Sequence, residues 1–198
     1  MAYYKSIGLI GRAQSGKDSV GSRLQQRYGY QRVAFADPLK KAALQLNPFV
    51  TAWTGGTNSR QVRLAEIVHL HGWDEAKTAY PEVRRILQHI GQTVREIAPD
   101  FWIQAAIPAV KAAYSLNLPV VVTDVRYENE ARALEGMGFH MIRVTRPGAG
   151  VRGDGARHKS ETELANYPTA LTIENTGTLD DLNRIVDSLL LPRSAQRR

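Results

Sequence analysis

The segment that most constrains the fold is a glycine-rich loop near the N-terminus, Gly11-Arg12-Ala13-Gln14-Ser15-Gly16-Lys17. It follows an apolar stretch, residues 6–10, and precedes a helical pattern over residues 16–28. The spacing G-x-x-x-x-G-K between a strand and a helix is typical of a P-loop, whose backbone N–H groups surround a phosphate while the lysine contacts it. A chance glycine-rich turn is the alternative. We predict a phosphate-binding site over residues 11–19, with Lys17 as a catalytic cation.

One position departs from the usual P-loop pattern. The residue after the lysine is normally Ser or Thr, whose hydroxyl binds magnesium. Here it is Asp18, and Ser19 comes one place later. Either Asp18 through a bound water or Ser19 through its hydroxyl is a candidate for holding Mg²⁺, and the sequence leaves this choice open.

Apolar stretches that read as strands alternate with helical patterns along the chain. The expected strands cover residues 6–10, 33–36, 119–123, 140–145 and 170–173, and the expected helices 16–28, 38–46, 61–71, 81–98, 100–115, 128–136 and the segment after 178. This alternation predicts an α/β, P-loop NTPase-type three-layer fold with a parallel sheet of about five strands and helices on both faces. We expect one domain over 1–198, with a helical insertion on the substrate side (47–80, including a loop at 54–58), a lid loop (146–158) and a basic tail (192–198).

Composition narrows the function classes. The chain has no cysteine, which excludes disulfides and cysteine-ligated metals. Its formal net charge of +7 favours polyanionic partners. The arginines are spread singly, which suits a phosphate pocket better than a nucleic-acid stripe, so no specific nucleic acid is expected. No stretch is apolar enough for a signal peptide or a membrane span, and we expect a cytoplasmic protein without a membrane partner.

Charged residues follow two of the expected strands. Asp124 ends the most apolar strand, where ligands of α/β sheets bind, and it can hold magnesium or cap the next helix. Arg126 can reach a phosphate or pair with Glu130 at i+4. Asp37 and Lys40 follow the second strand and are candidate substrate contacts, with helix capping and solvent exposure as the alternatives.

The expected helix over 81–98 has two distinct sides. Its apolar residues gather on one side: Val83, Leu87, Ile90, Val94 and Ile97. Away from that side lies a polar stripe that either binds the acceptor or is simply solvated: Arg84, Gln88 and Arg95. Trp102, shortly after this helix, can stack on a nucleobase or belong to the core.

The segment after the strand at 140–145 is rich in glycine and arginine. Phosphoryl transfer needs exclusion of water and positive charge around the migrating group. A closing loop that carries Arg146, Arg152 and Arg157 supplies both, although a disordered basic loop is the alternative. Which arginine is catalytic stays open.

Several blocks, in order along the chain, resemble the deoxynucleoside monophosphate kinases of bacteriophages. They are GRAQSGKDS at residues 11–19, FADPLK at 35–40, LQHIGQTVR at 87–95 followed by Trp102, TDVRYENE at 123–130, HKSE at 158–161 and NTGT at 175–178. The resemblance implies ATP with Mg²⁺ as the donor, a deoxynucleoside 5′-monophosphate as the acceptor, and dNDP and ADP as products. It favours substrate contacts from Gln88, Arg95, Arg126 and Glu130, and it places Asn175 beside the adenine.

Two other classes of function compete with this interpretation. One is a P-loop kinase for another phosphorylated small molecule, of the phosphomevalonate or dephospho-coenzyme A type. The other is a non-catalytic nucleotide-binding protein that contacts DNA through its basic surface. The accepted bases, the exclusion of ribonucleotides and the choice between monomer and homodimer stay open.

Overall fold

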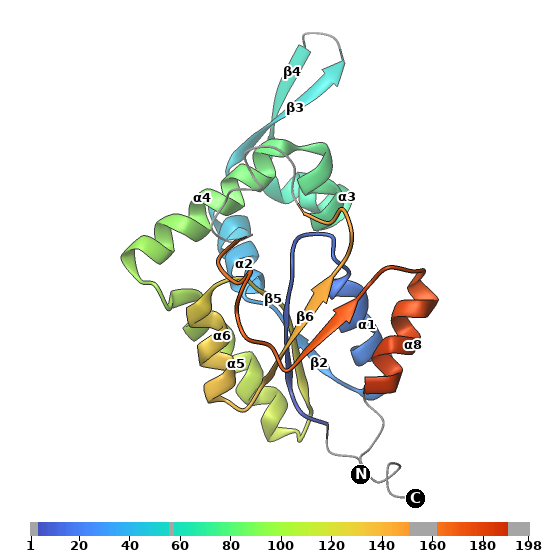
Figure 1. Cartoon of the computed structure of the whole chain (residues 1–198). Coiled ribbons are helices and arrows are strands. Elements are labelled where there is room, and N and C mark those ends of the chain that lie inside the picture. Colours follow the sequence, from blue (N-terminus) through green and yellow to red (C-terminus); the bar gives the residue numbers. More distant parts are fainter. Residues whose placement is uncertain (1–3, 56–57, 151–161, 190–198) are drawn as a thin grey trace, which may run out of the picture. The chain divides into compact units, whose positions relative to one another are not determined.

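The computed structural model describes residues 4–55, 58–150 and 162–189, and its contacts divide the chain into two compact units (Figure 1). We call residues 1–35 with 106–198 the sheet unit and residues 36–105 the helical unit. Helix α5 (Phe101–Ser115) begins in the helical unit and ends in the sheet unit. The expected insertion, residues 47–80, lies wholly within the helical unit.

The sheet unit contains a five-stranded parallel sheet in the order β2-β5-β1-β6-β7. Its strands are β1 (Ile7–Ile10), β2 (Gln31–Val33), β5 (Val120–Val125), β6 (His140–Thr145) and β7 (Leu171–Glu174). All four residues of β1 are buried, as expected for a strand with paired neighbours on both sides and helices on both faces. The predicted parallel sheet of about five strands is confirmed.

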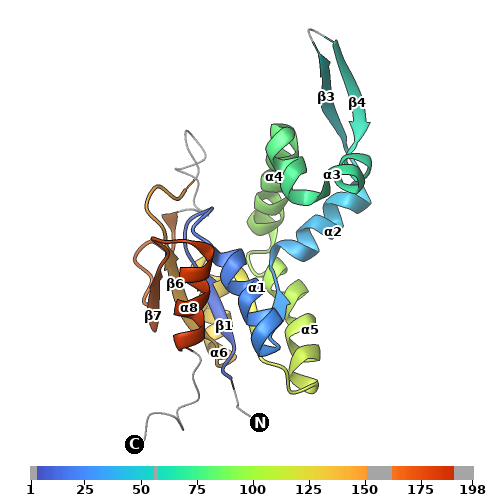
Figure 2. The same cartoon turned by 90° about the vertical axis from the view of Figure 1, so that its right-hand side faces the viewer.

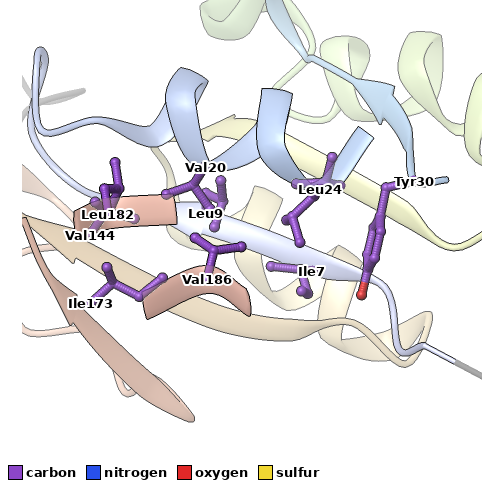
Figure 3. Packing of buried hydrophobic residues seen from close by; sticks show 10 residues of the cluster. Ile7, Leu9, Val20, Leu24, Tyr30, Val144, Ile173, Leu182 and Val186 are labelled. Carbon is purple, nitrogen blue, oxygen red and sulfur yellow. The ribbon is translucent and has the colours of Figure 1, made fainter. Parts of the chain in front are cut away.

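Helices cover both faces of this sheet. Helices α1 (Lys17–Tyr28) and α8 (Leu179–Leu189) lie on one face, and α6 (Glu128–Gly136) lies on the other (Figure 1). Side chains alternate along β1 accordingly. Ile7 and Leu9 belong to the hydrophobic cluster beneath α1 and α8, and Figure 3 shows the residues of this cluster. Gly8 faces the other side of the sheet, where a Cβ would lie 3.3 Å from Leu134 of α6. The predicted three-layer α/β fold is therefore confirmed.

A capping box between Thr178 and Asp181 opens α8. The backbone N–H and the hydroxyl of Thr178 donate to Asp181 Oδ2 at 3.0 and 2.7 Å, and the Asp181 N–H donates to Thr178 Oγ1 at 3.2 Å. These hydrogen bonds satisfy donors that the first turn of a helix leaves unpaired. Leu182 and Val186 then pack into the core, while Leu189 at the end of the helix is 40% exposed.

The helical unit combines helices with a two-stranded antiparallel hairpin (Figure 2). Its elements are α2 (Ala36–Leu46), β3 (Phe49–Gly55), β4 (Asn58–Arg63), α3 (Leu64–Ala79), which is kinked at Gly72, and α4 (Pro81–Ile97). A separate hydrophobic cluster holds this unit together, and it includes Ala43, Val50, Leu64, Val83 and Leu87. Ile97, expected on the apolar side of α4, is 81% exposed because it lies at the end of the helix.

Two predictions of secondary structure were wrong. Residues 54, 55 and 58 of the expected loop and residues 61–63 of the expected helix lie in the strands of the hairpin, in which buried Val50 and Val62 are a cross-strand pair. The second strand covers residues 31–33 instead of 33–36. It ends there because the Phe35 N–H donates to the Asp124 carboxylate at 2.9 Å instead of to a strand neighbour.

No helix in residues 4–55, 58–150 and 162–189 combines the length and the apolar character that a membrane span requires.

The contact between α1 and β5 leaves no room for a side chain at Gly21. A Cβ there would lie 2.5 Å from Thr123 Cγ2. We expect Gly21→Ala to destabilise the protein, because overpacking costs about 1–3 kcal/mol and the gain in helix propensity returns at most about 1 kcal/mol. Urea denaturation measures the effect. The matched control is Gly136→Ala in α6, where a Cβ meets no atom of the described residues within 4 Å; equal stabilities of the two variants would contradict the prediction.

A second prediction concerns the ionic contact between α1 and α8. Arg23 donates to both carboxylate oxygens of Asp187 at 2.9 and 2.6 Å, and the Tyr28 hydroxyl donates to one of them at 2.9 Å. These hydrogen bonds, led by that from Arg23, lower the pKa of Asp187 to about 2. A lowered folded-state pKa stabilises the protein above the unfolded-state value, and this contribution is lost as the pH falls from about 4 to about 2.

We therefore expect Asp187→Asn to lower the free energy of unfolding near neutral pH and to make little difference at about pH 2. Denaturation curves at the two pH values test this. Asp180→Asn, at an exposed position of the same helix, is the matched control. An equal loss of stability from Asp187→Asn at both pH values would show that the pairing does not act through charge.

Candidate active site

The glycine-rich loop joins the central strand β1 to helix α1. Its backbone has positive φ at Gly11 (154°), Gln14 (63°) and Gly16 (106°). A Cβ at Gly11 would lie 2.3 Å from the Val144 carbonyl oxygen, and one at Gly16 would lie 2.5 Å from Asn175 Nδ2. Both glycines are therefore required by close approach as well as by conformation.

Lys17 is the first residue of α1, and its side chain turns back over the loop. Lys17 is 7% exposed, and its Nζ donates to the carbonyl oxygens of Gly11 and Arg12 at 2.7 and 2.8 Å. The ammonium group is thus held at the mouth of the loop, close to the helix N-terminus with its partial positive charge. This is the arrangement that an anion at the loop requires.

A cavity of about 440 Å³ opens beside the loop, entirely within the sheet unit. Its described lining contains four arginines and neither aspartate nor glutamate. Ser15 also lines it, and the buried Ser15 hydroxyl has no hydrogen-bond partner among the described residues. Such a cavity suits a ligand with several negative charges. The arginines in the lining are Arg12, Arg126, Arg143 and Arg146.

The four arginines differ in how they are held. Arg143, in β6, donates through Nη2 to the carbonyl oxygens of Leu164 and Tyr167 at 3.0 and 2.7 Å, and burial lowers its pKa. Arg12 and Arg146 are exposed, and neither makes an ion pair within the described parts of the chain. Sequence reasoning missed Arg143, although a charged residue in an otherwise mostly apolar strand was a usable signal.

Arg126 stands directly before α6, and Glu130 holds the backbone there. Glu130 is 1% exposed, and its Oε2 accepts the N–H groups of Arg126 at 2.8 Å and Tyr127 at 3.2 Å. The predicted substrate contact by Glu130 does not fit this burial, because its carboxylate caps α6. Glu130 instead helps to orient the segment that brings Arg126 to the cavity.

The candidate magnesium ligands are spread around the loop. Asp18 is exposed in the first turn of α1, Ser19 is half-buried, and Asp124 accepts the Phe35 N–H. Among the residues that the structure describes, no group of three acidic or histidine side chains is arranged to hold a metal. Magnesium in phosphoryl-transfer sites takes one or two carboxylates, with water and substrate phosphates as the remaining ligands. The residues present are compatible with that mode of binding.

Asn175, expected beside an adenine, lies instead against the loop. The residue is 4% exposed, its Nδ2 donates to the Ser15 carbonyl at 2.9 Å, and its backbone N–H donates to the Thr145 carbonyl at 2.8 Å. The side-chain amide is therefore engaged with the protein. Residues 152 and 157, the other lid arginines, lie outside the described residues.

The helical unit carries the remaining candidates. Lys40 Nζ lies 4.0 Å from the Asp37 carboxylate and 5.9 Å from the centre of the Trp73 ring. Leu39 of α2 packs at Gly91 of α4, so α2 and α4 are neighbours. The polar stripe on α4 is accessible, with two exposed members and one half-buried: Arg84, Gln88 and Arg95.

Trp102 takes the second of its two predicted roles. Its residue is 3% exposed, and its indole N–H donates to the Gly91 carbonyl at 3.1 Å. A tryptophan with its polar edge paired and its ring buried supports the packing between α4 and α5. It is not accessible for stacking on a base.

Comparison with known proteins shows which family the chain belongs to. Residues 56–186 match the model of the deoxynucleotide monophosphate kinase family. A protein of Acanthamoeba polyphaga mimivirus, named as a candidate deoxynucleotide monophosphate kinase, is 26% identical over 193 residues, which cover 88% of this chain and 90% of that protein. The uncharacterized protein ORF77 of Ictalurid herpesvirus 1 (strain Auburn) is 34% identical over 100 residues. That match covers 50% of this chain and 44% of the herpesvirus protein, so the chain spans less than half the length of this relative.

The crystal structure of shikimate kinase from Aquifex aeolicus superposes over 98% of this chain and 99% of its own, with a TM-score of 0.43 and 12% identity. A likeness this remote bears on neither substrate nor mechanism. The family match covers more than half of the chain and includes the TDVRYENE block and Asn175, which donates to the loop. The relatives named here come from viruses of other kinds than bacteriophages. The chain belongs to the deoxynucleotide monophosphate kinase family.

Proposed function

We propose that this kinase transfers the γ-phosphoryl group of ATP to a deoxynucleoside 5′-monophosphate, giving ADP and a deoxynucleoside diphosphate. The observation that carries the proposal is the cavity beside the loop, which four arginines line and into which no described carboxylate intrudes. A triphosphate has the charge that this lining requires, and the loop beside it offers backbone N–H groups and the Lys17 ammonium group.

The chemical step needs little besides positioning and charge. An oxygen of the acceptor phosphate attacks the γ-phosphorus, while the bond from that phosphorus to the β–γ bridging oxygen breaks and leaves its electron pair on ADP. The attacking oxygen is already ionised, so no side chain has to act as a strong base. Lys17 and the cavity arginines stabilise the negative charge that develops on the transferred group. Bound Mg²⁺ supplies further charge neutralisation, with Asp18, Ser19 and Asp124 as the candidate protein contacts.

The acceptor site is assigned to the helical unit. Lys40 and the stripe Arg84, Gln88 and Arg95 offer positive charge for a monophosphate and an amide for a base edge, and all of them are at least partly accessible. The proposal places no substrate contact on Glu130 or Trp102, because both are buried and their polar atoms are paired within the protein.

A coupled assay of ADP release tests the function directly. It is run with Mg-ATP and each of the four deoxynucleoside monophosphates in turn, with phosphomevalonate and dephospho-coenzyme A as the rival acceptors. ADP release that depends on a deoxynucleotide supports the proposal and defines the range of bases. Release with a rival acceptor alone, or ATP binding without any turnover, would contradict it.

Within the same assay we expect Lys17→Ala to lower kcat by about 10²-fold or more, because the variant removes the cation nearest to the transferred charge. The fold should persist, since Gly11 and Arg12, whose carbonyls accept hydrogen bonds from Lys17, belong to the loop and not to the core. Lys111→Ala, at an exposed position of α5, is the matched control and should leave kcat unchanged. Near-normal turnover by a folded Lys17→Ala protein would show that Lys17 does not take part in catalysis.

A further inference from the structure

Asn175 connects the phosphate loop to the two strands beside it. It directly follows β7, its backbone N–H donates to Thr145 at the end of β6 at 2.8 Å, and its side chain donates to the Ser15 carbonyl at 2.9 Å. A carbonyl oxygen can only accept, so the side-chain atom that faces it is the amide nitrogen. With 4% of the residue exposed, water competes little for this hydrogen bond.

The absence of a side chain at Gly16 makes this contact possible. A Cβ at that position would lie 2.5 Å from Asn175 Nδ2 and 3.4 Å from Leu182 Cδ2. The amide therefore lies directly against the main chain of the loop, with α8 behind it. The site is built by elements that are far apart in sequence, and the resulting hydrogen bond spans 160 positions.

The hydrogen bond determines which way one peptide group of the loop faces. The Ser15–Gly16 peptide is trans, so its C=O and N–H point in opposite directions. Because Asn175 holds the carbonyl, the Gly16 N–H faces away from Asn175. Among the described residues this N–H has no hydrogen-bond partner, and the Ser15 hydroxyl beside it is likewise unpartnered and lines the arginine cavity.

We infer that Asn175 is a positioning residue of the phosphate loop, which orients the Ser15–Gly16 peptide so that its N–H donates to a phosphate of the nucleotide. The inference rests on the proposed function, since it assigns the loop to a nucleotide phosphate. It replaces the expected contact with an adenine by a contact with the protein. Asn175 acts through the loop backbone and does not touch the reacting atoms.

The test separates the phosphate part of the nucleotide from its base. Calorimetry measures the binding of Mg-ATP and of magnesium tripolyphosphate, which has no base, to the full chain and to Asn175→Asp. This variant keeps the shape of the side chain but directs a carboxylate oxygen at the Ser15 carbonyl. We expect both ligands to bind about tenfold more weakly, by the same factor, because one oriented donor is lost from each complex.

Two further variants serve as controls for this result. Asn175→Ala removes the hydrogen bond to the Ser15 carbonyl without adding a charge, and it should weaken the binding of both ligands by the same factor. Asn117→Asp adds the same charge at an exposed position of the sheet unit that does not line the cavity, and it should change neither affinity by a comparable factor. Circular dichroism confirms that each variant is folded, and in the kinetic assay the KM for ATP should rise while the KM for the acceptor stays constant.

Other outcomes overturn the inference in recognisable ways. Weaker ATP binding with unchanged tripolyphosphate binding would show that Asn175 acts at the base. Unchanged binding of both ligands by the folded variants would show that the hydrogen bond from Asn175 to Ser15 has no role in phosphate binding. If the unmodified protein binds neither ligand, the proposed function itself fails, and this result differs from the other two.

Discussion

The burial of β1 in the middle of the parallel sheet is the constraint on which the rest of the site depends. The strand pairs with β5 on one side and β6 on the other, and all four of its residues are buried. The chain must therefore leave the sheet at Ile10 between two neighbouring strand ends. The loop that follows has so little space that Gly11 packs against the Val144 backbone. Central burial thus determines where an anion can approach and which groups surround it.

The positive charges around the loop are arranged in two layers. Lys17 and Arg143 donate hydrogen bonds to backbone carbonyls, which hold their charged groups in place. Arg12 and Arg146 stand outside, exposed to solvent. Neutral acceptors leave the attraction for an anion intact, whereas carboxylate partners would cancel it. The family to which the chain belongs transfers phosphoryl groups, and charge held in this way is what that chemistry uses.

The sequence allowed good prediction of elements whose signal is local. The apolar run of β5 and the bounds of α6 and β6 depend on neighbouring residues and were confirmed. The β3–β4 hairpin was missed because the pattern around Val62 and Leu64 fits a helix as well as a strand, and the pairing with Val50 decides between them. Contacts across long stretches of chain were not predictable at all. Two such contacts depend on strand order, which no local pattern reveals: the hydrogen bond from Asn175 to Ser15 and the hydrogen bond from Arg143 to Leu164.

The way Lys17 is held has a consequence for how such a loop can change during evolution. Its ammonium group is bound by main-chain oxygens of Gly11 and Arg12, which every amino acid possesses. The identities of the side chains at 12, 13 and 14 are therefore not tied to the orientation of the lysine. Substitutions there leave in place the two carbonyl oxygens that bind the ammonium group. A lineage that keeps this backbone path can therefore change the residue types along the loop without losing the acceptors that orient the lysine.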